Sequence, residues 1–481
     1  MALTETRPDF ARREVTAVAG LVGLVLLAFS GRYGYHRDEL YFLEAGKHLA
    51  WGYPDQPPLV PLIARVMQAI SPDSLVLLRL PSTLAATGVV LLAGAMARDL
   101  GARRGGQVLA AAATGLCGFV LATGHLLSTA TFSLLGWTTM TAILVKVLQG
   151  GRPRLWLLLG VVAGVTLQAN VLALALVGAL GLAIVLVGPR DLFGRVGPYL
   201  AVALAGILVA PYLVWQARNG WPQIDVGRSI AAGGSGSSQS RWAFLPFQFL
   251  QVGPWLAPLW LTGLRRLFRD ETLRCLAVTY AVLAVVFVIG GGKPYYLSGL
   301  YPLLFAAGSQ RYLDAARRWV VPVLLAASTP VLLIVLPVLP AHDEGPIVAI
   351  NYDAGETIGW PSYVDQIAAA YHRLPPGTAI LTDNYGEAGA IDHYGPQRGL
   401  PSAHSGHNAY GDWGPPPGSA PVLAIGLDPA LLRASCTEER PLGTLKDPTG
   451  IDNDENGTTL VFCSGPVRPW AGLWHRFRHL G

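Results

Sequence analysis

Two adjacent carboxylates, Asp38 and Glu39, stand directly after the first long apolar run of the chain. Carboxylates beside a membrane are costly unless they are solvated, paired or used in chemistry. A carboxylate within hydrogen-bond reach of a hydroxyl can remove its proton as the hydroxyl attacks, so the pair is a candidate for general-base catalysis. The structural alternative is that Asp38 caps a helix and Glu39 favours its first turn. The residue types leave both roles open.

A further carboxylate lies in the Gly-Tyr-Pro-Asp-Gln-Pro-Pro stretch over residues 52–58. Proline fixes the backbone φ angle, so this turn is predicted to be stiff. Asp55 and Tyr53 are therefore candidates for contacts with an acceptor or for a secondary role in catalysis.

A lysine, Lys293, follows three glycines and precedes Pro-Tyr-Tyr in another polar connection. Glycines let the backbone approach a ligand closely, and an ammonium group is a sufficient point charge for a phosphate. A lysine that reaches toward lipid headgroups is the structural alternative. Tyr295, Tyr296 and Arg79 are weaker candidates for the same phosphate site, and His125 is a candidate for a secondary role. For Arg79 and His125, the structural alternative is a polar group whose hydrogen bonds are satisfied at the membrane interface and which binds no ligand.

Most of the elements that must position these side chains are apolar. The chain has 481 residues, of which 52% are hydrophobic and 14% charged, and its mean hydropathy is +0.42. Soluble domains carry about 25% charged residues, so much of this surface is expected to face lipid. We predict a polytopic α-helical membrane protein with about eleven transmembrane helices, over residues 15–30, 76–97, 106–123, 127–148, 155–169, 171–187, 197–217, 243–264, 273–291, 295–309 and 319–340.

Basic residues alternate between successive connections. If the N-terminus is cytoplasmic, the arginine-rich connections near residues 98–104, 146–154, 190–195, 265–274 and 311–318 all lie inside. Lys and Arg concentrate in cytoplasmic loops, so the pattern predicts a multi-pass plasma-membrane protein whose C-terminus lies outside. The first apolar run is expected to be retained, because it lacks a small-residue cleavage site. The net charge of +5 follows this bias and does not indicate nucleic acid.

Two outer connections are long. Residues 38–49 and 58–70 have helical spacing of apolar residues, which predicts amphipathic helices in the membrane interface at about 38–70. Residues 218–242 contain Gly-Gly-Ser-Gly-Ser-Ser-Gln-Ser and are predicted to form a mobile loop.

From residue 341 onward, turn-forming residues and short β-like runs replace the long apolar stretches. We therefore divide the chain into a transmembrane catalytic domain, 1–340, and a small extracytoplasmic α/β domain, 341–481. Strands are expected at residues 379–382, 422–425 and 459–463. At about 140 residues the second domain can bury its own core.

Cys436 and Cys463 are the two cysteines of this second domain. Disulfides persist outside the cytoplasm, so we predict that the two residues are joined. The crosslink should contribute about 3 kcal/mol by limiting the unfolded chain. Two unpaired thiols are the alternative. Cys117 and Cys275 lie in apolar runs, where cysteine behaves as a small hydrophobic residue, and the cysteine spacing does not indicate zinc.

Four stretches resemble the GT-C membrane glycosyltransferases, in the branch of protein O-mannosyltransferases and lipid A aminoarabinose transferases (glycosyltransferase family 39). They are HRDELYFLEAGKHLAWGYPDQPPLVPLIAR at 36–65, GGKPYYLSGLYPLLFAAG at 291–308, NYGEAGAIDHYG at 384–395 and SGHNAYGDWGP at 405–415. The resemblance covers most of the chain, and its first stretch is the most specific.

The resemblance implies a GT-C-like fold and transfer of a hexose or pentose from a polyprenyl-phosphate donor, with inversion, to a protein, lipid or glycan outside the cytoplasm. By position, Asp38 corresponds to the general base, with Glu39 orienting it or sharing the acceptor, and Lys293 corresponds to the cation near the phosphate. Asn384 and Glu387, in the third stretch, are implied as acceptor or secondary residues.

The chain departs from this pattern near Ala130, where many relatives carry an acidic residue and residues 125–131 contain none. A second carboxylate, if one is needed, must be Asp55 or come from the C-terminal domain. No cofactor is firmly implied. A divalent metal is compatible with the sequence, but no cluster of ligands supports one.

Two other functions are consistent with a polytopic chain. A transporter or lipid flippase would carry ionisable residues near the bilayer midplane, whereas the polar groups here gather at the predicted outer rim. A GT-C-like scaffold without catalytic activity is the third reading, and Ala130 in the expected acidic region motivates it.

Overall fold

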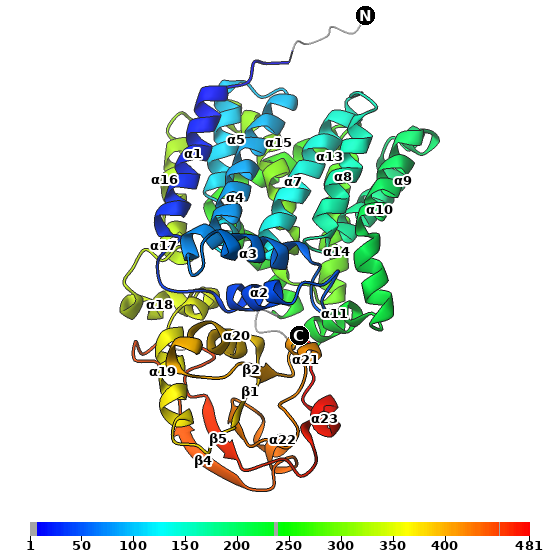
Figure 1. Ribbon diagram of the computed structural model, residues 1–481. Helices are drawn as coiled ribbons and strands as arrows, with labels where there is room; N and C mark the ends of the chain where they lie inside the picture. The colour runs from blue at the N-terminus through cyan, green and yellow to red at the C-terminus, as the bar shows by residue number, and fades with distance from the viewer. Residues whose placement is uncertain (1–6, 235–238, 452) are drawn as a thin grey trace, which may run out of the picture.

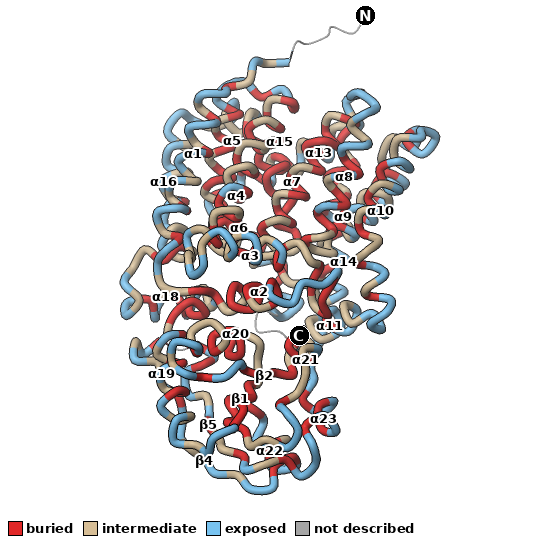
Figure 2. Tube along the Cα trace, in the orientation of Figure 1, coloured by how far each residue is buried: buried red, intermediate tan, exposed pale blue. Residues whose placement is uncertain are grey.

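The computed structural model describes residues 7–234, 239–451 and 453–481. A bundle of helices occupies one part of the molecule, and a small unit built around a sheet covers one end of it (Figure 1). Helix α1 (Arg12–Phe29) begins at the opposite end of the bundle from this sheet (Figure 1). Buried residues follow the inward sides of the bundle helices and continue into the junction between bundle and sheet unit (Figure 2).

Each predicted apolar run contains at least one helix. The bundle helices are α1 (Arg12–Phe29), α4 (Leu75–Asp99), α5 (Arg104–Gly115), α6 (Gly118–His125), α7 (Thr129–Leu148), α8 (Leu155–Leu167), α9 (Ala173–Val187), α10 (Val196–Arg218), α12 (Phe244–Val252), α13 (Ala257–Arg269), α14 (Arg274–Gly290), α15 (Tyr301–Ala315), α16 (Val320–Ser328) and α17 (Val331–Val335).

Three of the runs predicted as single helices are broken. The run at 106–123 divides into α5 and α6, which meet at an angle of 58°. The run at 243–264 breaks at Gly253, which has a positive φ of 105° and is followed by Pro254. The run at 319–340 breaks at Pro330. Proline lacks the backbone N–H that would continue a helix, which explains the last two breaks.

Within the described residues, three helices, α4, α7 and α10, are long and apolar enough to cross a membrane, and the bent pair α5–α6 makes a fourth if it is one span. Other apolar helices in the described residues are shorter, so about eleven spans stays a prediction. Large apolar side chains point away from the bundle, including Leu24, Ile207 and Ile289, each about two-thirds exposed. Such surfaces are unusual on soluble proteins and suit contact with lipid.

Two short helices, α2 (Arg37–Lys47) and α3 (Leu59–Ile70), cross the end of the bundle that faces the sheet unit (Figure 1). Both were expected to lie in the membrane interface. Helix α3 does expose apolar side chains, among them Ile70. Helix α2 instead packs against α3 on one side and α20 (Tyr385–Tyr394) on another, which buries Leu40 and Phe42. Protein, rather than lipid, therefore covers the apolar face of α2.

The 218–242 connection also differs from the predicted loop. Helix α11 (Pro222–Ala231) fills much of it, because Pro222 supplies a φ angle suited to the first helical turn. Residues 235–238 of its Gly/Ser stretch lie outside the described residues.

The sheet has five strands in the order β2-β1-β3-β5-β4. Strands β1 (Ala379–Thr382), β3 (Val422–Ile425) and β5 (Thr459–Cys463) lie where the sequence predicts them, whereas β2 (Ala403–Ser405) and β4 (Glu439–Thr444) were not foreseen. Strand β1 runs parallel to β2 and β3, while β5 is antiparallel to its neighbours. Strands β1 and β3 are fully buried, which matches their continuous apolar sequences.

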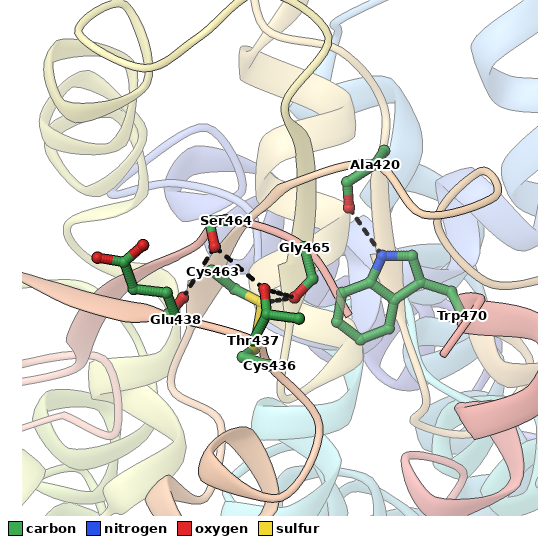
Figure 3. The surroundings of a disulfide bond; sticks show 8 residues. All are labelled: Ala420, Cys436, Thr437, Glu438, Cys463, Ser464, Gly465 and Trp470. Atoms are coloured by element: carbon green, nitrogen blue, oxygen red, sulfur yellow. Dashed lines mark hydrogen bonds between the residues drawn. A yellow bond between two sulfur atoms is a disulfide. The ribbon is translucent and has the colours of Figure 1, made fainter. Parts of the chain in front are cut away.

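The predicted disulfide between Cys436 and Cys463 is present, with α-carbons 5.7 Å apart. It ties the chain entering β4 to the end of β5, where the Thr437 hydroxyl also donates to the carbonyl of Gly465 over 2.9 Å (Figure 3). The nearby Trp470 indole donates to the carbonyl of Ala420 over 2.9 Å (Figure 3). The other cysteines, Cys117 and Cys275, are free and buried.

Candidate active site

His36, rather than Asp38, caps helix α2. The His36 ring Nδ1 accepts a hydrogen bond from Asp38 N–H over 3.2 Å, and the Glu39 carboxylate accepts from His36 N–H over 2.9 Å. These reciprocal bonds satisfy backbone donors at the helix start, as in a capping box. The Asp38 carboxylate is therefore not used as the cap.

The Asp38 carboxylate accepts a hydrogen bond from the hydroxyl of Tyr385 over 2.8 Å. Asp38 is partly exposed, and Tyr385 is the first residue of α20. The sheet unit thus supplies a donor that orients a carboxylate on the bundle side. Burial and the nearby Asp38 charge raise the pKa of Tyr385, so its phenol stays protonated and continues to donate.

The Tyr385 ring is enclosed by groups from both parts of the chain. The Arg37 guanidinium lies 5.3 Å from its centroid, the Tyr41 ring 4.7 Å and the His407 ring 4.7 Å. An aromatic ring with a cation over its face and rings at its sides is held in one orientation. The hydrogen bond to Asp38 is therefore preorganised.

A second carboxylate, Asp55 of the 52–58 turn, accepts a hydrogen bond from Tyr41 over 2.7 Å. The Tyr41 hydroxyl in turn accepts from Ala409 N–H over 3.3 Å. Burial raises the pKa of the Asp55 carboxyl to about 7, and the charges of Asp38 and Asp412 add to the rise. The Asp38 charge acts on the Asp55 carboxyl, so we treat the two carboxylates as parts of one candidate site.

Lys293 lies at the start of the helical turn η4 (Pro294–Leu300), between α14 and α15. Gln248 and Gln251 of α12 both donate to the carbonyl of Pro294, which fixes the backbone beside the lysine. Burial lowers the pKa of Lys293, while the charges of Asp38 and Asp353 oppose the change. The Lys293 ammonium is therefore within electrostatic range of the Asp38 carboxylate.

Tyr295 and Tyr296 pack beside this lysine. The Lys293 ammonium lies 6.0 Å from the Tyr295 centroid, and the Tyr295 ring stacks on Phe119 of α6 at 5.4 Å. Tyr296 packs against Phe287 at 5.3 Å. These contacts are apolar, so they position Lys293 and leave the phosphate-binding role of the two tyrosines untested.

Glu39 and Arg79 form a fully buried ion pair. The Arg79 guanidinium donates to both Glu39 oxygens, over 2.9 and 2.7 Å, and to the carbonyls of Ser30 and Gly34. The Glu39 carboxylate also accepts from Leu127 N–H. Because both side chains have their hydrogen bonds filled by protein groups, the pair holds α2 on the bundle. This geometry disfavours contact of Glu39 with an acceptor and of Arg79 with the phosphate.

Four other candidates also have structural partners or are enclosed. The Tyr53 hydroxyl donates to the carbonyl of Ala45 over 2.9 Å. Asn384 and Glu387 form the capping box of α20. Tyr363 donates to Glu387 as well, and burial raises the pKa of this carboxyl to about 7. His125 is 5% exposed at the end of α6. Their predicted contacts with an acceptor remain untested.

The sequence reasoning missed Tyr385 and Tyr41, the two hydroxyl donors to Asp38 and Asp55. Tyr385 lies inside the NYGEAGAIDHYG stretch, between the predicted site residues Asn384 and Glu387. This position is the one feature of the sequence that could have indicated a role for Tyr385. In the described residues, no group of three His, Cys, Asp or Glu side chains is arranged to hold a metal ion.

The site thus combines two carboxylates with hydroxyl donors and one partly buried cation. Such a set can accept a proton and stabilise an anion within one region.

Residues 55–215 match the family model described as dolichyl-phosphate-mannose-protein mannosyltransferase. No curated protein matches the chain. Among solved structures, ArnT from Cupriavidus metallidurans matches with a TM-score of 0.59 and 16% identity, covering 94% of this chain and 97% of that one. ArnT bound to undecaprenyl phosphate gives a TM-score of 0.58 at 17% identity, with the same coverage of both chains.

The arabinofuranosyltransferase AftD from Mycobacteria matches with a TM-score of 0.53 and 14% identity, covering 94% of this chain and 40% of that one. The match with ArnT includes the helical bundle and the sheet unit, since it extends over nearly all of both chains. The chain therefore has the GT-C fold of membrane glycosyltransferases.

Proposed function

We propose that this protein is a glycosyltransferase that moves a sugar from a polyprenyl-phosphate donor to a hydroxyl group outside the cytoplasm. The GT-C fold, the mannosyltransferase family match over residues 55–215 and the undecaprenyl phosphate held by ArnT support a lipid-linked donor. Protein, lipid and glycan acceptors all supply the hydroxyl that this reaction needs.

The observation that carries the proposal is the Asp38 carboxylate. The capping role is taken by His36, one carboxylate oxygen is held by Tyr385, and the residue remains partly exposed. A carboxylate that is oriented and accessible is suited to act as a general base.

In the proposed reaction, the acceptor hydroxyl gives its proton to Asp38 while its oxygen forms a bond to the anomeric carbon. The bond from that carbon to the phosphate oxygen breaks, and polyprenyl phosphate leaves with the electron pair. Lys293 stabilises the negative charge that develops on the phosphate. Attack opposite the leaving phosphate inverts the anomeric centre.

Asp55 is the proposed second carboxylate, in place of the acidic residue absent near Ala130. It lies in the same electrostatic environment as Asp38, and its hydrogen bond from Tyr41 holds it toward the sheet unit. Its role is to accept a hydrogen bond from the acceptor or to share the proton.

The proposed topology places residues 1–340 in the plasma membrane with a cytoplasmic N-terminus and residues 341–481 outside. The sheet unit lies at the opposite end of the bundle from the start of α1, which supports this orientation (Figure 1). Cysteines introduced at Arg104 and Gly234 should be labelled from opposite sides of the membrane. Labelling from the same side would contradict the orientation.

The experiment that tests the activity uses purified protein and a panel of undecaprenyl-phosphate hexoses and pentoses with a labelled sugar. We expect consumption of at least one donor, and Asp38→Asn should slow it by about 100-fold or more. Asp343→Asn, an exposed aspartate distant in sequence from the site, is the control and should behave as wild type.

Two outcomes would contradict this proposal. If the wild type consumes no donor in the panel, the glycosyltransferase function fails. If Asp38→Asn turns over at the wild-type rate, the base is a different residue, and Asp55 becomes the first to test.

A further inference from the structure

A cavity of about 280 Å³ opens where the outer end of the bundle meets the sheet unit. Pro54 and Asn219 line it from the bundle side, and Asn408, Asp412, Arg478 and His479 line it from the sheet unit. Figure 1 shows the same junction, with α11, α21 (Tyr410–Trp413) and the C-terminus close together.

The wall of this cavity is shaped by unusual backbone. Asn408 is 3% exposed and has a φ of 49°, in the left-handed region that few residues other than glycine adopt. Gly406 lies so close to Phe477 that an added Cβ would stand 1.9 Å from its carbonyl oxygen. Constrained backbone of this kind persists only where the surroundings hold it in place, and it clusters at binding sites.

Two short chains of contacts join the cavity to the candidate active site. Asn408 precedes Ala409, whose N–H donates to the Tyr41 hydroxyl that holds Asp55. On the other side, the His479 ring stacks on His407 at 4.4 Å, and His407 packs on Tyr385 at 4.7 Å. The Tyr41 hydroxyl thus connects Asp55 to the cavity wall, and Tyr385 connects Asp38 to it in the same way.

The geometry points to this cavity as the acceptor subsite, and its chemistry suits one sugar residue of a glycan acceptor. This inference rests on the proposed glycosyltransferase function. The Asp412 carboxylate accepts hydrogen bonds, the Arg478 guanidinium donates them, and the Asn219 amide does both. A polyhydroxylated ring needs such alternating partners, whereas a lipid chain would need an apolar wall.

The size of the cavity agrees with a single ring. Sites for drug-sized molecules occupy about 300–1,000 Å³, so this cavity of about 280 Å³ lies just below that range. Asp412 and Arg478 form an ion pair across part of the lining, which fixes both side chains before a ligand arrives. A hydroxyl of the bound sugar could then be directed inward, toward Asp55 and Asp38.

The test fills the cavity from its exposed side with Asn219→Trp. Purified protein is given the donor identified from the panel, together with methyl glycosides of hexoses and pentoses as acceptor probes. The ratio of sugar transferred to the glycoside over sugar released to water should fall by about tenfold or more. Asn219→Ala controls for the lost Asn219 hydrogen bond to the Trp215 carbonyl, and Gln397→Trp controls for a new surface tryptophan.

An unchanged ratio in Asn219→Trp would overturn the subsite. Transfer to a Ser/Thr peptide, with no transfer to any methyl glycoside, would overturn the glycan assignment. If the wild type consumes no donor at all, the proposed glycosyltransferase function is contradicted. A separate binding measurement then tests whether the cavity holds a sugar.

That measurement labels Asn219→Cys with a membrane-impermeant maleimide. The free native cysteines, Cys117 and Cys275, are buried, so the label should report on position 219. Methyl glycosides should slow the labelling several-fold if the sugar occupies the cavity. Labelling that is unaffected at saturating glycoside would exclude a sugar site there, whatever the donor assay gives.

Discussion

At the scale of single residues, the neighbours Asp38 and Glu39 have opposite surroundings. Glu39 is fully buried and bonded to Arg79, whereas Asp38 is partly exposed and bonded to Tyr385. A buried charge must be paired, and the Arg79 guanidinium supplies that partner. Two adjacent carboxylates are thus separated into one that holds helix α2 and one that remains available for chemistry.

The pKa of Asp55, raised to about 7 by burial, predicts a pH dependence. If its carboxylate takes part in the reaction, kcat/KM for the donor should rise as pH increases through about 7, because the ionised fraction rises there. Asp55→Asn should remove this rise. A raised pKa also means that the folded state holds the proton more tightly, so stability should fall as pH rises from about 4 to 7, and less so in the variant.

The measurement is a pH profile of donor consumption for wild type and Asp55→Asn, with thermal unfolding followed over the same range. A rise that persists unchanged in Asp55→Asn would show that another group titrates.

Substitutions of Lys293 should show whether donor use depends on the positive charge of this side chain or on its shape. We expect Lys293→Ala to lower donor use by about tenfold or more, because the phosphate loses its cation, while Lys293→Arg retains part of the activity. Initial rates at several donor concentrations give the comparison. Equal rates in all three proteins would favour a lysine that only reaches toward lipid headgroups.

At the scale of elements, the site depends on how closely α20 approaches α2. A Cβ added to Gly389 would lie 3.0 Å from the Leu40 Cβ and 3.1 Å from the Leu40 carbonyl carbon. A Cβ added to Gly386 would lie 2.9 Å from the Arg37 Cβ. Glycine at both positions lets the helices touch, and this contact brings Tyr385 to Asp38.

Gly389→Val should push the two helices apart and weaken the Tyr385–Asp38 hydrogen bond. We expect a loss of about 1–3 kcal/mol in stability, the usual range for an overpacked contact, and a fall in donor consumption. Gly472→Val is the control, since a Cβ there would meet no atom within 4 Å. Thermal unfolding and donor turnover in both variants provide the test, and equal behaviour of the two would contradict the close packing.

At the scale of the whole molecule, Arg37 connects the bundle to the sheet unit. Its guanidinium lies 3.1 Å from a Glu356 oxygen and 3.1 Å from an Asp454 oxygen, and it also covers Tyr385. The Glu356 side chain is 1% exposed, so this part of the junction contains a buried charge pair. The site is complete only while the two parts stay together.

Arg37→Met should leave Glu356 buried without its partner. The expected loss in free energy of unfolding is about 3 kcal/mol, because removing one member of a buried pair exposes the desolvation cost of the other. The double variant Arg37→Met/Glu356→Gln should recover part of this loss. Arg440→Met, at an exposed arginine over Phe462, is the control and should change stability by about 0.5 kcal/mol or less.

Unfolding of the variants in detergent and their sensitivity to protease after residue 340 measure the effect. A double variant that is less stable than Arg37→Met would contradict the assignment of Arg37 as the partner of Glu356.

The features that depend on local pattern could be predicted from the amino-acid sequence. Apolar runs predicted the helices of the bundle, short buried runs predicted β1, β3 and β5, and the two cysteines of the last 141 residues predicted the disulfide. These features follow from periodicity, burial and residue type along one segment. The same reasoning identified Asp38, Asp55 and Lys293 as groups able to do chemistry.

Tertiary contacts determine which of these carboxylates stays available for chemistry and which is held in a structural ion pair. Asp38 meets Tyr385 across 347 positions of sequence, and Glu39 meets Arg79 across 40. No local pattern encodes such pairs, because they depend on how α2, α4 and α20 pack. The cap at His36, the donors Tyr385 and Tyr41 and the cavity at the junction therefore came from the packing of distant segments.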